Sequence, residues 1–222
     1  SDRLQKKSFF TDPLVFLSQG ERQHNGSILL RLSRLLSKFI ARERFILAQT
    51  IIEKLPHQNK LSYLLHDSAA YSPLHLSCLH GNNVLIRAQL QGLSHEEKAL
   101  YLSYPSRHEQ VNALHIAASN NWAVCLETML QSVDGEGKER ILSAQDARGF
   151  TALHWAVANK ALESIATLTK YMSTSCQALR NHAGQTAGDM TTDPQIMQWL
   201  SNHHDSFISE SPQALPTTRT SP

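Results

Sequence analysis

A seven-residue motif recurs along the chain, and this recurrence constrains the fold more than any other feature. Residues 72–78 (SPLHLSC), 112–118 (NALHIAA) and 151–157 (TALHWAV) align without gaps, and a weaker copy begins at Thr186. The copies therefore start 40, 39 and 35 residues apart. A period of about 20–50 residues is typical of repeat proteins, in which no unit can bury its apolar face alone. The sequence thus predicts an array of stacked units.

Turn signals precede the motif at matching distances. Asp67, Asp146 and Asn181 each stand five residues before the start of a copy. Gly149 and Gly184 each stand two residues before one. Asp and Asn initiate turns through their side chains, and Gly supplies the backbone freedom that a turn needs. Each of these segments is expected to be a turn that leads into a helix.

Together, turn and motif resemble the ankyrin repeat, an Asp-x-x-Gly turn followed by Thr-Pro-Leu-His-x-Ala. The match is best over 67–81 and 146–158; the copy at 107–118 lacks the Asp and the Gly, and the last copy lacks the Leu-His pair. The resemblance implies an all-α solenoid of helix-turn-helix repeats with finger turns and helical caps at both ends. We divide the chain into a capping region (1–65), repeats at about 66–105, 106–145 and 146–180, a degraded repeat (181–208) and a disordered tail (209–222).

Each unit is expected to hold a short inner helix on the motif and a longer outer helix after it. The outer helices are predicted at roughly 83–93, 122–132 and 162–172. Their apolar residues should face the next unit. In the first two these are Val84, Leu85, Ala88 and Leu90, then Val124, Leu126, Met129 and Leu130.

Two units are roughly six or seven residues longer than the family period of about 33. The extra residues predict a helix in the same slot of successive units, at 58–65, 94–102 and 137–142. Ser94 is a typical N-cap, and Glu96 and Glu97 favour a helix start. Each connection is therefore expected to gain about one helical turn.

The ends of the array also predict helices. Residues 27–41 and 45–55 form an amphipathic pair that should cap the first repeat, although a separate partner-binding helix is the alternative. A short helix is expected from Thr11-Asp12-Pro13, with Leu14 to Leu17 packed on this cap. Asp193-Pro194 should open a C-terminal capping helix.

Composition excludes several classes of protein. With 41% hydrophobic residues and a net charge of only +2, the chain is neither disordered overall nor an evident nucleic-acid binder. The longest apolar stretch, 28–41, is interrupted by Arg31, Arg34 and Lys38, so no membrane span is expected. Three cysteines cannot form a disulfide framework, which favours a reducing, intracellular compartment.

Motifs for enzyme or metal chemistry are missing from the sequence. There is no Cys-x-x-Cys, His-Glu-x-x-His, phosphate-binding loop or Gly-x-Ser-x-Gly. His75, His115 and His154 share one repeat position, so they should be spaced along the array, and the resemblance implies that they bond the backbone of neighbouring turns. Cys78 and Cys125 are expected in the core and Cys176 at the surface. We expect no catalysis, no metal and no cofactor.

The resemblance further implies that a partner protein binds at the finger turns and the concave inner-helix face. Carried over by position, the candidate residues are Tyr71, Leu79, His80, His108, Glu109, Val111, Asn120, Arg148, Phe150 and Asn159. Tyr71, Val111 and Phe150 form an apolar row at a usually exposed position. Aromatic residues near Arg are typical of binding hot spots. Packing of the finger bases against one another is the other interpretation.

The sequence therefore predicts a monomeric protein-binding module. Its lengthened repeats suit a secreted bacterial effector that acts on a host protein in the host cytoplasm. The alternative is the substrate-recognition module of a larger enzyme, with a catalytic domain outside these residues. A third hypothesis is a small enzyme that uses Cys176 or histidines, but the sequence contains no motif that supports it.

Overall fold

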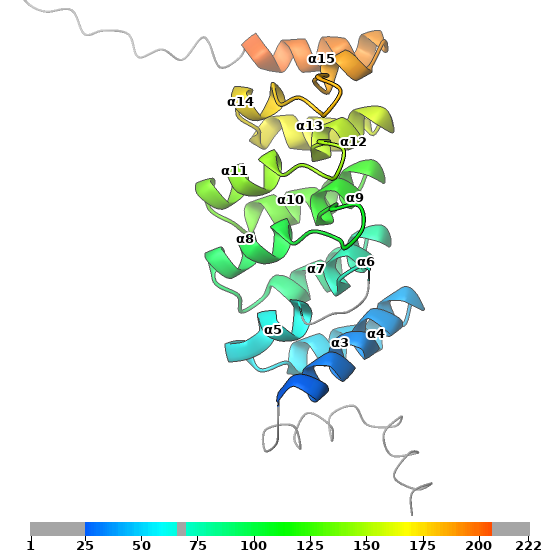
Figure 1. Ribbon diagram of the computed structural model, residues 1–222, viewed down its shortest axis with the longest axis vertical. Coiled ribbons are helices and arrows are strands. Elements are labelled where there is room, and N and C mark those ends of the chain that lie inside the picture. The colour runs from blue at the N-terminus through cyan, green and yellow to red at the C-terminus, as the bar shows by residue number, and fades with distance from the viewer. Residues whose placement is uncertain (1–24, 66–69, 206–222) are drawn as a thin grey trace, which may run out of the picture.

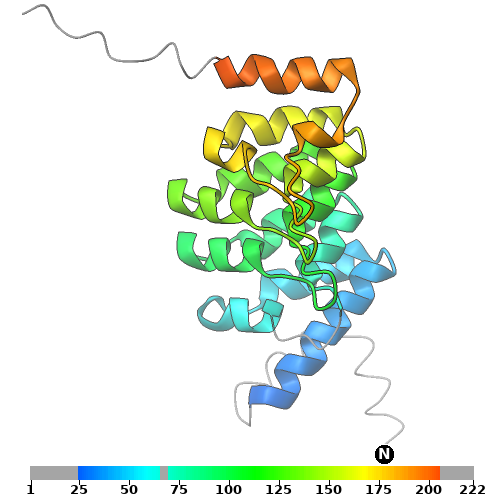
Figure 2. The same ribbon diagram turned by 45° about the horizontal axis from the view of Figure 1, so that its top comes forward.

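The chain is a stack of helices in three columns. The computed structural model describes residues 25–65 and 70–205, and every regular element in these ranges is helical. Short inner helices form one column, longer outer helices the second, and the helices of the extra residues the third (Figures 1 and 2). The predicted all-α repeat stack is confirmed.

The inner helices begin with a cap that the repeated motif supplies. They are α6 (Pro73–Leu79), α9 (Ala113–Ser119) and α12 (Ala152–Ala158), and α9 packs on both others. The residue before each helix and the histidine at its third position form a capping box. In α6, Nδ1 of His75 lies 2.7 Å from the Ser72 hydroxyl and accepts the Ser72 N–H at 3.2 Å. The motif thus satisfies backbone donors that a helix start would otherwise leave unpaired.

The outer helices bury one face in a regular pattern. They are α4 (Phe45–Lys54), α7 (Asn83–Leu90), α10 (Ala123–Gln131) and α13 (Leu162–Tyr171). In α7, α10 and α13, the buried face includes two pairs of adjacent residues, and the second pair follows the first by four residues. Residues four apart lie on the same face of a helix. The buried pairs are Leu85, Ile86, Gln89 and Leu90; Cys125, Leu126, Met129 and Leu130; Ser164, Ile165, Leu168 and Thr169.

The prediction that Val84 and Val124 face the next unit is wrong. Their side chains are 58% and 65% exposed. Each is the second residue of its outer helix and directly precedes the first buried pair, which places it toward solvent. In a continuous apolar run such as 84–86, periodicity does not determine which residues are buried.

The third column consists of the helices predicted from the extra residues. They are α5 (Lys60–Leu65), which follows a short 3-10 helix η2 (His57–Asn59), α8 (His95–Ser103), α11 (Gly135–Ser143) and α14 (Thr174–Gln177). Ser94 and Asp134 cap α8 and α11 by accepting N–H groups at 3.2 and 2.8 Å. Both helices have nine residues, so the expectation of about one extra turn was too low. Each helix of the column contacts the next (Figure 1).

A buried polar network connects the three columns within the first repeat. The Tyr101 hydroxyl of α8 donates to Oε1 of Gln89 in α7 at 2.6 Å. Nε2 of Gln89 donates to the Ser77 hydroxyl of α6 at 2.7 Å, and that hydroxyl donates to the Pro73 carbonyl at 2.9 Å. Because these side chains are fully or almost fully buried, their hydrogen bonds replace those that water would make.

A buried lysine attaches the first helix of the third column to the array. Lys60 is 3% exposed, and its ammonium group donates to the carbonyls of Ala88 and Gln91 at 2.6 and 2.7 Å. Burial lowers the pKa of Lys60. These carbonyls lie at the C-terminal end of α7, where helical carbonyls lack partners and a positive charge is favoured.

Helices close both ends of the stack. At the N-terminal end, α3 (Asn25–Ala41) packs on α6 while α4 packs on α7. At the C-terminal end, a 3-10 helix, η3 (Gly188–Met190), packs on α12 and α15 (Pro194–Asp205) packs on α13. The helices expected at these places are confirmed. The predicted helix from Thr11 and the tail at 209–222 lie outside the described residues.

The finger turns are joined edge to edge by their backbones. Arg107 N–H donates to the Ala70 carbonyl at 3.3 Å, Ala147 N–H to Glu109 at 3.0 Å, and His182 N–H to Arg148 at 3.0 Å. Gly149 has a φ of 78°, and a Cβ there would lie 2.7 Å from the His182 nitrogen. Only glycine fits this position, because both the backbone conformation and the space exclude a side chain.

Candidate functional site

The repeat histidines connect each inner helix to the next finger. Nε2 of His75 donates to the Val111 carbonyl at 2.9 Å, and Nε2 of His115 donates to the Phe150 carbonyl at 2.8 Å. His154 makes the corresponding bond to Gln185 at 3.1 Å. Carbonyls only accept, so each ring carries its proton on Nε2. The expected backbone bonding of these histidines is confirmed.

Burial keeps these rings neutral. It lowers the pKa of His75 and of His115 to about 4, and it also lowers the pKa of His154. A buried imidazole loses hydration when it is charged, so the neutral form is favoured. Within residues 25–65 and 70–205, no three His, Cys, Asp or Glu side chains are grouped so that they could hold a metal ion.

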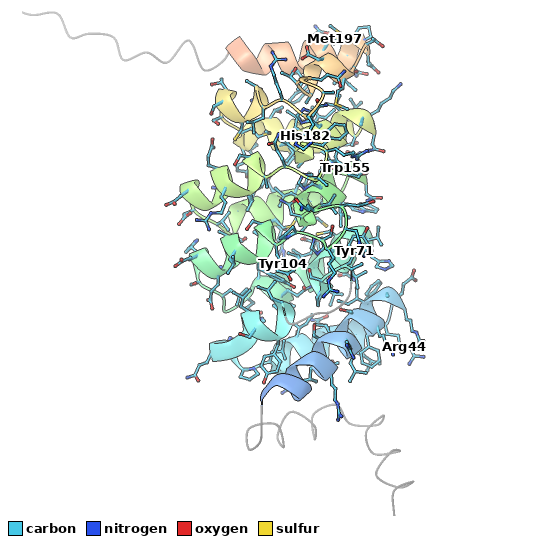
Figure 3. The ribbon with its side chains drawn as sticks, viewed as in Figure 1. Arg44, Tyr71, Tyr104, Trp155, His182 and Met197 are labelled. Atoms are coloured by element: carbon cyan, nitrogen blue, oxygen red, sulfur yellow. The ribbon has the colours of Figure 1, made fainter. Side chains whose placement is uncertain are left out.

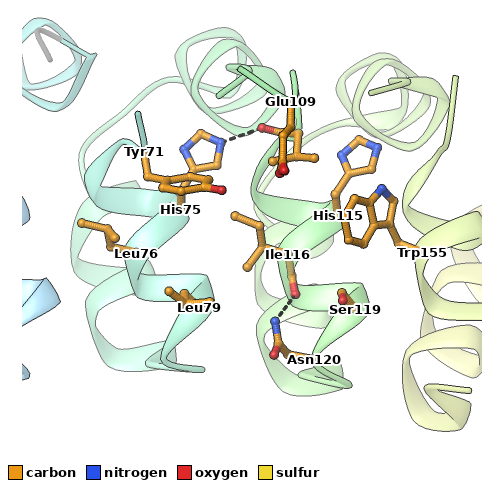
Figure 4. A pocket seen from close by; sticks show the side chains of 11 residues that line it. Tyr71, His75, Leu76, Leu79, Glu109, His115, Ile116, Ser119, Asn120 and Trp155 are labelled. Carbon is orange, nitrogen blue, oxygen red and sulfur yellow. Dashed lines mark hydrogen bonds between the residues drawn. The ribbon is translucent and has the colours of Figure 1, made fainter. Parts of the chain in front are cut away.

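A groove of about 240 Å³ lies on the inner-helix face between the first two repeats (Figure 4). Tyr71 and Val111 border it at the finger bases, and Leu76, Leu79 and Ile116 line it from α6 and α9. The remaining lining residues are His75, Glu109, His115, Ser119, Asn120 and Trp155. Leu79 is 51% exposed and Tyr71 36% exposed, so the groove offers apolar surface to a ligand.

Glu109 extends from the second finger over this groove. Figure 4 shows its carboxylate and the Tyr71 ring facing the same space above Ile116. Burial raises the pKa of Tyr71, and the negative charge of the nearby Glu109 carboxylate raises it further. A raised pKa keeps the Tyr71 hydroxyl protonated at neutral pH, so it faces the carboxylate as a neutral donor group.

The candidate residues are distributed over two places. Tyr71, Leu79, Glu109, Val111 and Asn120 line the groove. The others lie outside its lining: His80, His108, Arg148, Phe150 and Asn159. Figure 3 labels Tyr71, Trp155 and His182, which lie in this order along the array.

Val111 does not belong to an exposed apolar row. Its side chain is 2% exposed, its N–H donates to the Ser106 hydroxyl at 3.1 Å, and its carbonyl accepts from His75. These bonds fix the finger base so that the small valine side chain turns inward. The row of Tyr71, Val111 and Phe150 is therefore corrected to two separate rings, with a packed valine between them.

Phe150 takes part in a stacked cluster on the third finger. Its ring stacks on His154 with centroids 5.6 Å apart, and the Arg148 guanidinium lies 4.6 Å from it. The same guanidinium lies 5.2 Å from the Trp155 ring and 3.6 Å from the buried Asp146 carboxylate. Asp146 also accepts from the Trp155 indole at 3.1 Å. Arg148 is thus held in place by a carboxylate and two rings.

A comparison with protein families assigns this array. Residues 74–178 match the model for ankyrin repeats, in three copies. This segment of the chain is therefore an array of ankyrin repeats. A search of curated proteins finds no match to it. Ankyrin repeats indicate a protein–protein interaction module, and the family is generally non-catalytic. Within the described part of the chain, no helix combines the length and the apolarity that crossing a bilayer requires.

The cysteines of this ankyrin array are all free and buried. The expectation that Cys176 is exposed is wrong: its side chain is 3% exposed and its Sγ lies 3.1 Å from Oε1 of Glu139. Ser173 caps α14 by accepting the Cys176 N–H, and α14 packs on α11, so the thiol faces the interior of the array. Burial raises the pKa of Cys125 and of Cys176 to about 11, and raises that of Cys78 strongly.

Sequence reasoning missed three lining residues of the groove. Leu76, Ile116 and Trp155 occupy the variable position of the ankyrin Leu-His-x-Ala motif. Each of these residues directly follows the buried repeat histidine, and successive residues of a helix are rotated by about 100° around its axis. The side chain after the histidine therefore faces the concave surface. The recurrence of a large apolar residue at this position in three units could have indicated that it lines a binding surface.

Proposed function

We propose that this ankyrin array is a non-catalytic module that binds a partner protein against its finger turns and concave inner-helix face. The groove between α6 and α9 carries the proposal, because Tyr71 and Leu79 leave apolar area exposed there. Apolar concavities with a polar border are typical binding sites. His80, His108, Asn120, Arg148 and Asn159 would form that border.

Leu79 and Leu100 offer a matched pair for the test, because their side chains are 51% and 48% exposed. Leu79 lines the groove, whereas Leu100 belongs to α8 in the third column.

Partners captured from host-cell lysates by the full chain are identified by mass spectrometry and then titrated by calorimetry. Leu79→Asp should weaken binding at least about tenfold, as the loss of a central contact does. Leu100→Asp should leave it unchanged. Equal effects of the two variants would contradict this assignment.

The proposed setting is that of a secreted bacterial effector, monomeric in the reducing cytoplasm of a host cell. The recurrent third helix that lengthens the repeats and the three buried free thiols support it. A translocation reporter fused to the chain tests delivery into host cells. Light scattering should give the mass of one chain, 24.9 kDa. Failure of either measurement would remove that part of the proposal.

A further inference from the structure

The groove contains a single charged side chain at neutral pH. Of its eleven lining residues, three can carry charge below pH 9: His75, Glu109 and His115. The two histidines are neutral, because burial lowers their pKa to about 4. The groove therefore has a negative charge at Glu109 and none to balance it among its lining residues.

Neighbouring cations do not neutralise Glu109 in the described structure. No lysine or arginine lies within ion-pair distance of its carboxylate there, and the Tyr71 hydroxyl is its neighbour. Arg148, on the next finger, is engaged by Asp146 and stacks on Phe150 and Trp155. Arg107 is exposed on the same finger, and it is not among the residues that form ion pairs in the described structure.

The walls suit the stem of a long cationic side chain. Leu76, Leu79 and Ile116 present aliphatic surface below the carboxylate, and the ring of Tyr71 stands beside it (Figure 4). Lysine and arginine place their methylene groups along apolar surface while the charged head reaches a polar partner. An aromatic face adds a favourable interaction with the cation. The volume of about 240 Å³ is below the range of about 300–1,000 Å³ that small-molecule sites occupy.

We propose that this groove binds an arginine or lysine side chain of the partner protein, next to an apolar residue that contacts Leu79. Glu109 pairs with the cation, and the Tyr71 ring lies beside the methylene stem. This inference rests on the proposed function, and it adds the chemistry of the segment that the partner presents. Charge complementarity at Glu109 selects this segment over an acidic one.

The probe is a library of random ten-residue peptides displayed on phage and selected against the full chain. Selected sequences should contain Arg or Lys beside an apolar residue. Glu109→Gln should remove this enrichment, and Glu109→Lys should replace it with Asp or Glu. Enrichment of acidic or purely apolar peptides on the unmodified protein, or no enrichment, would overturn the inference.

A selected peptide is then titrated by fluorescence anisotropy. Glu109→Gln should weaken it about tenfold or more, because a paired charge is lost. Glu136→Gln, which changes an exposed carboxylate on α11, should alter the affinity less than twofold. Both variants should melt as the parent does, since surface substitutions seldom affect stability. Equal binding by Glu109→Gln and the parent would refute the role of Glu109.

The two proposals can fail separately. Loss of the captured partner with Leu79→Asp, but full binding with Glu109→Gln, would retain the binding face and refute the cationic anchor. If neither variant affects the partner, the binding face itself is refuted.

Discussion

The repeat histidines make the folded state sensitive to acid. His75 and His115 are 1% exposed, and their neutral rings bridge an inner helix to the next finger. In the unfolded chain they titrate near 6.5, whereas burial lowers the pKa of each to about 4 in the folded state. The unfolded state therefore binds more protons between these values, so stability is complete above about pH 6.5 and falls as the pH falls toward 4.

We predict a large loss of stability between pH 7 and pH 5. Each ring should contribute about 2 kcal/mol to this loss, since a proton difference costs about 1.4 kcal/mol per pH unit. Urea unfolding followed by circular dichroism measures it. His115→Gln should be less stable at pH 7 but lose less between the two pH values, and the exposed His108→Gln should behave as the parent. An unchanged pH dependence in His115→Gln would contradict a buried neutral ring.

The cysteines should react only when the protein unfolds. The thiolate is the nucleophile, and burial raises the pKa of Cys125 and Cys176 to about 11. A colourimetric thiol reagent should find almost no reactive group within minutes in the native chain and three in urea. Rapid native modification of Cys176 would show that α14 opens readily.

The residues that sequence reasoning misplaced share a physical cause. Capping boxes, helix positions and the histidine bridges depend on local patterns, so the motif predicted them. The burial of Cys176 depends instead on the packing of α14 against α11, and the burial of Val111 on the attachment of its finger base to His75. The exposure of Val84 and Val124 depends on how each outer helix is rotated about its own axis. These features follow from packing between units, which a single unit does not encode.

At the scale of elements, the third column is attached to the repeats by buried polar contacts. Tyr101 of α8 reaches Gln89 of α7, which in turn reaches Ser77 of α6. Lys60 of α5 similarly reaches the end of α7. The extra helices are thus part of each unit rather than surface additions.

Tyr101→Phe should destabilise the protein by about 1–3 kcal/mol, because Oε1 of Gln89 would lose its donor while buried. Tyr104→Phe is the control, since Tyr104 is only half-buried and lies just after α8. Denaturant melts of both variants measure the difference. A cost for Tyr104→Phe equal to that for Tyr101→Phe would show that ring packing, rather than the network, is responsible.

At the scale of the molecule, each unit completes the core of its neighbour. Ala187 and Ile196 are 1% and 0% exposed, and the Gln185 carbonyl accepts from His154. Removal of residues 181–222 would therefore expose α12 and α13 along their packed faces.

We expect the chain truncated after residue 180 to melt roughly 10 °C lower, equivalent to about 3–4 kcal/mol, and to aggregate. Deletion of 209–222 alone should change the melting temperature little. Scanning calorimetry and light scattering compare the two. Equal melting temperatures would show that the last unit is not part of the cooperative array.

The third column also affects the stiffness of the stack. Two parallel columns of helices can rotate about the line along which they contact each other. A third column beside them adds a second set of contacts between successive repeats, which restricts this rotation. Contacts from α5 through α8 and α11 to α14 therefore resist torsion between successive repeats. The spacing between α6 and α9 is fixed before any partner arrives, so binding there loses less conformational entropy than in a flexible solenoid.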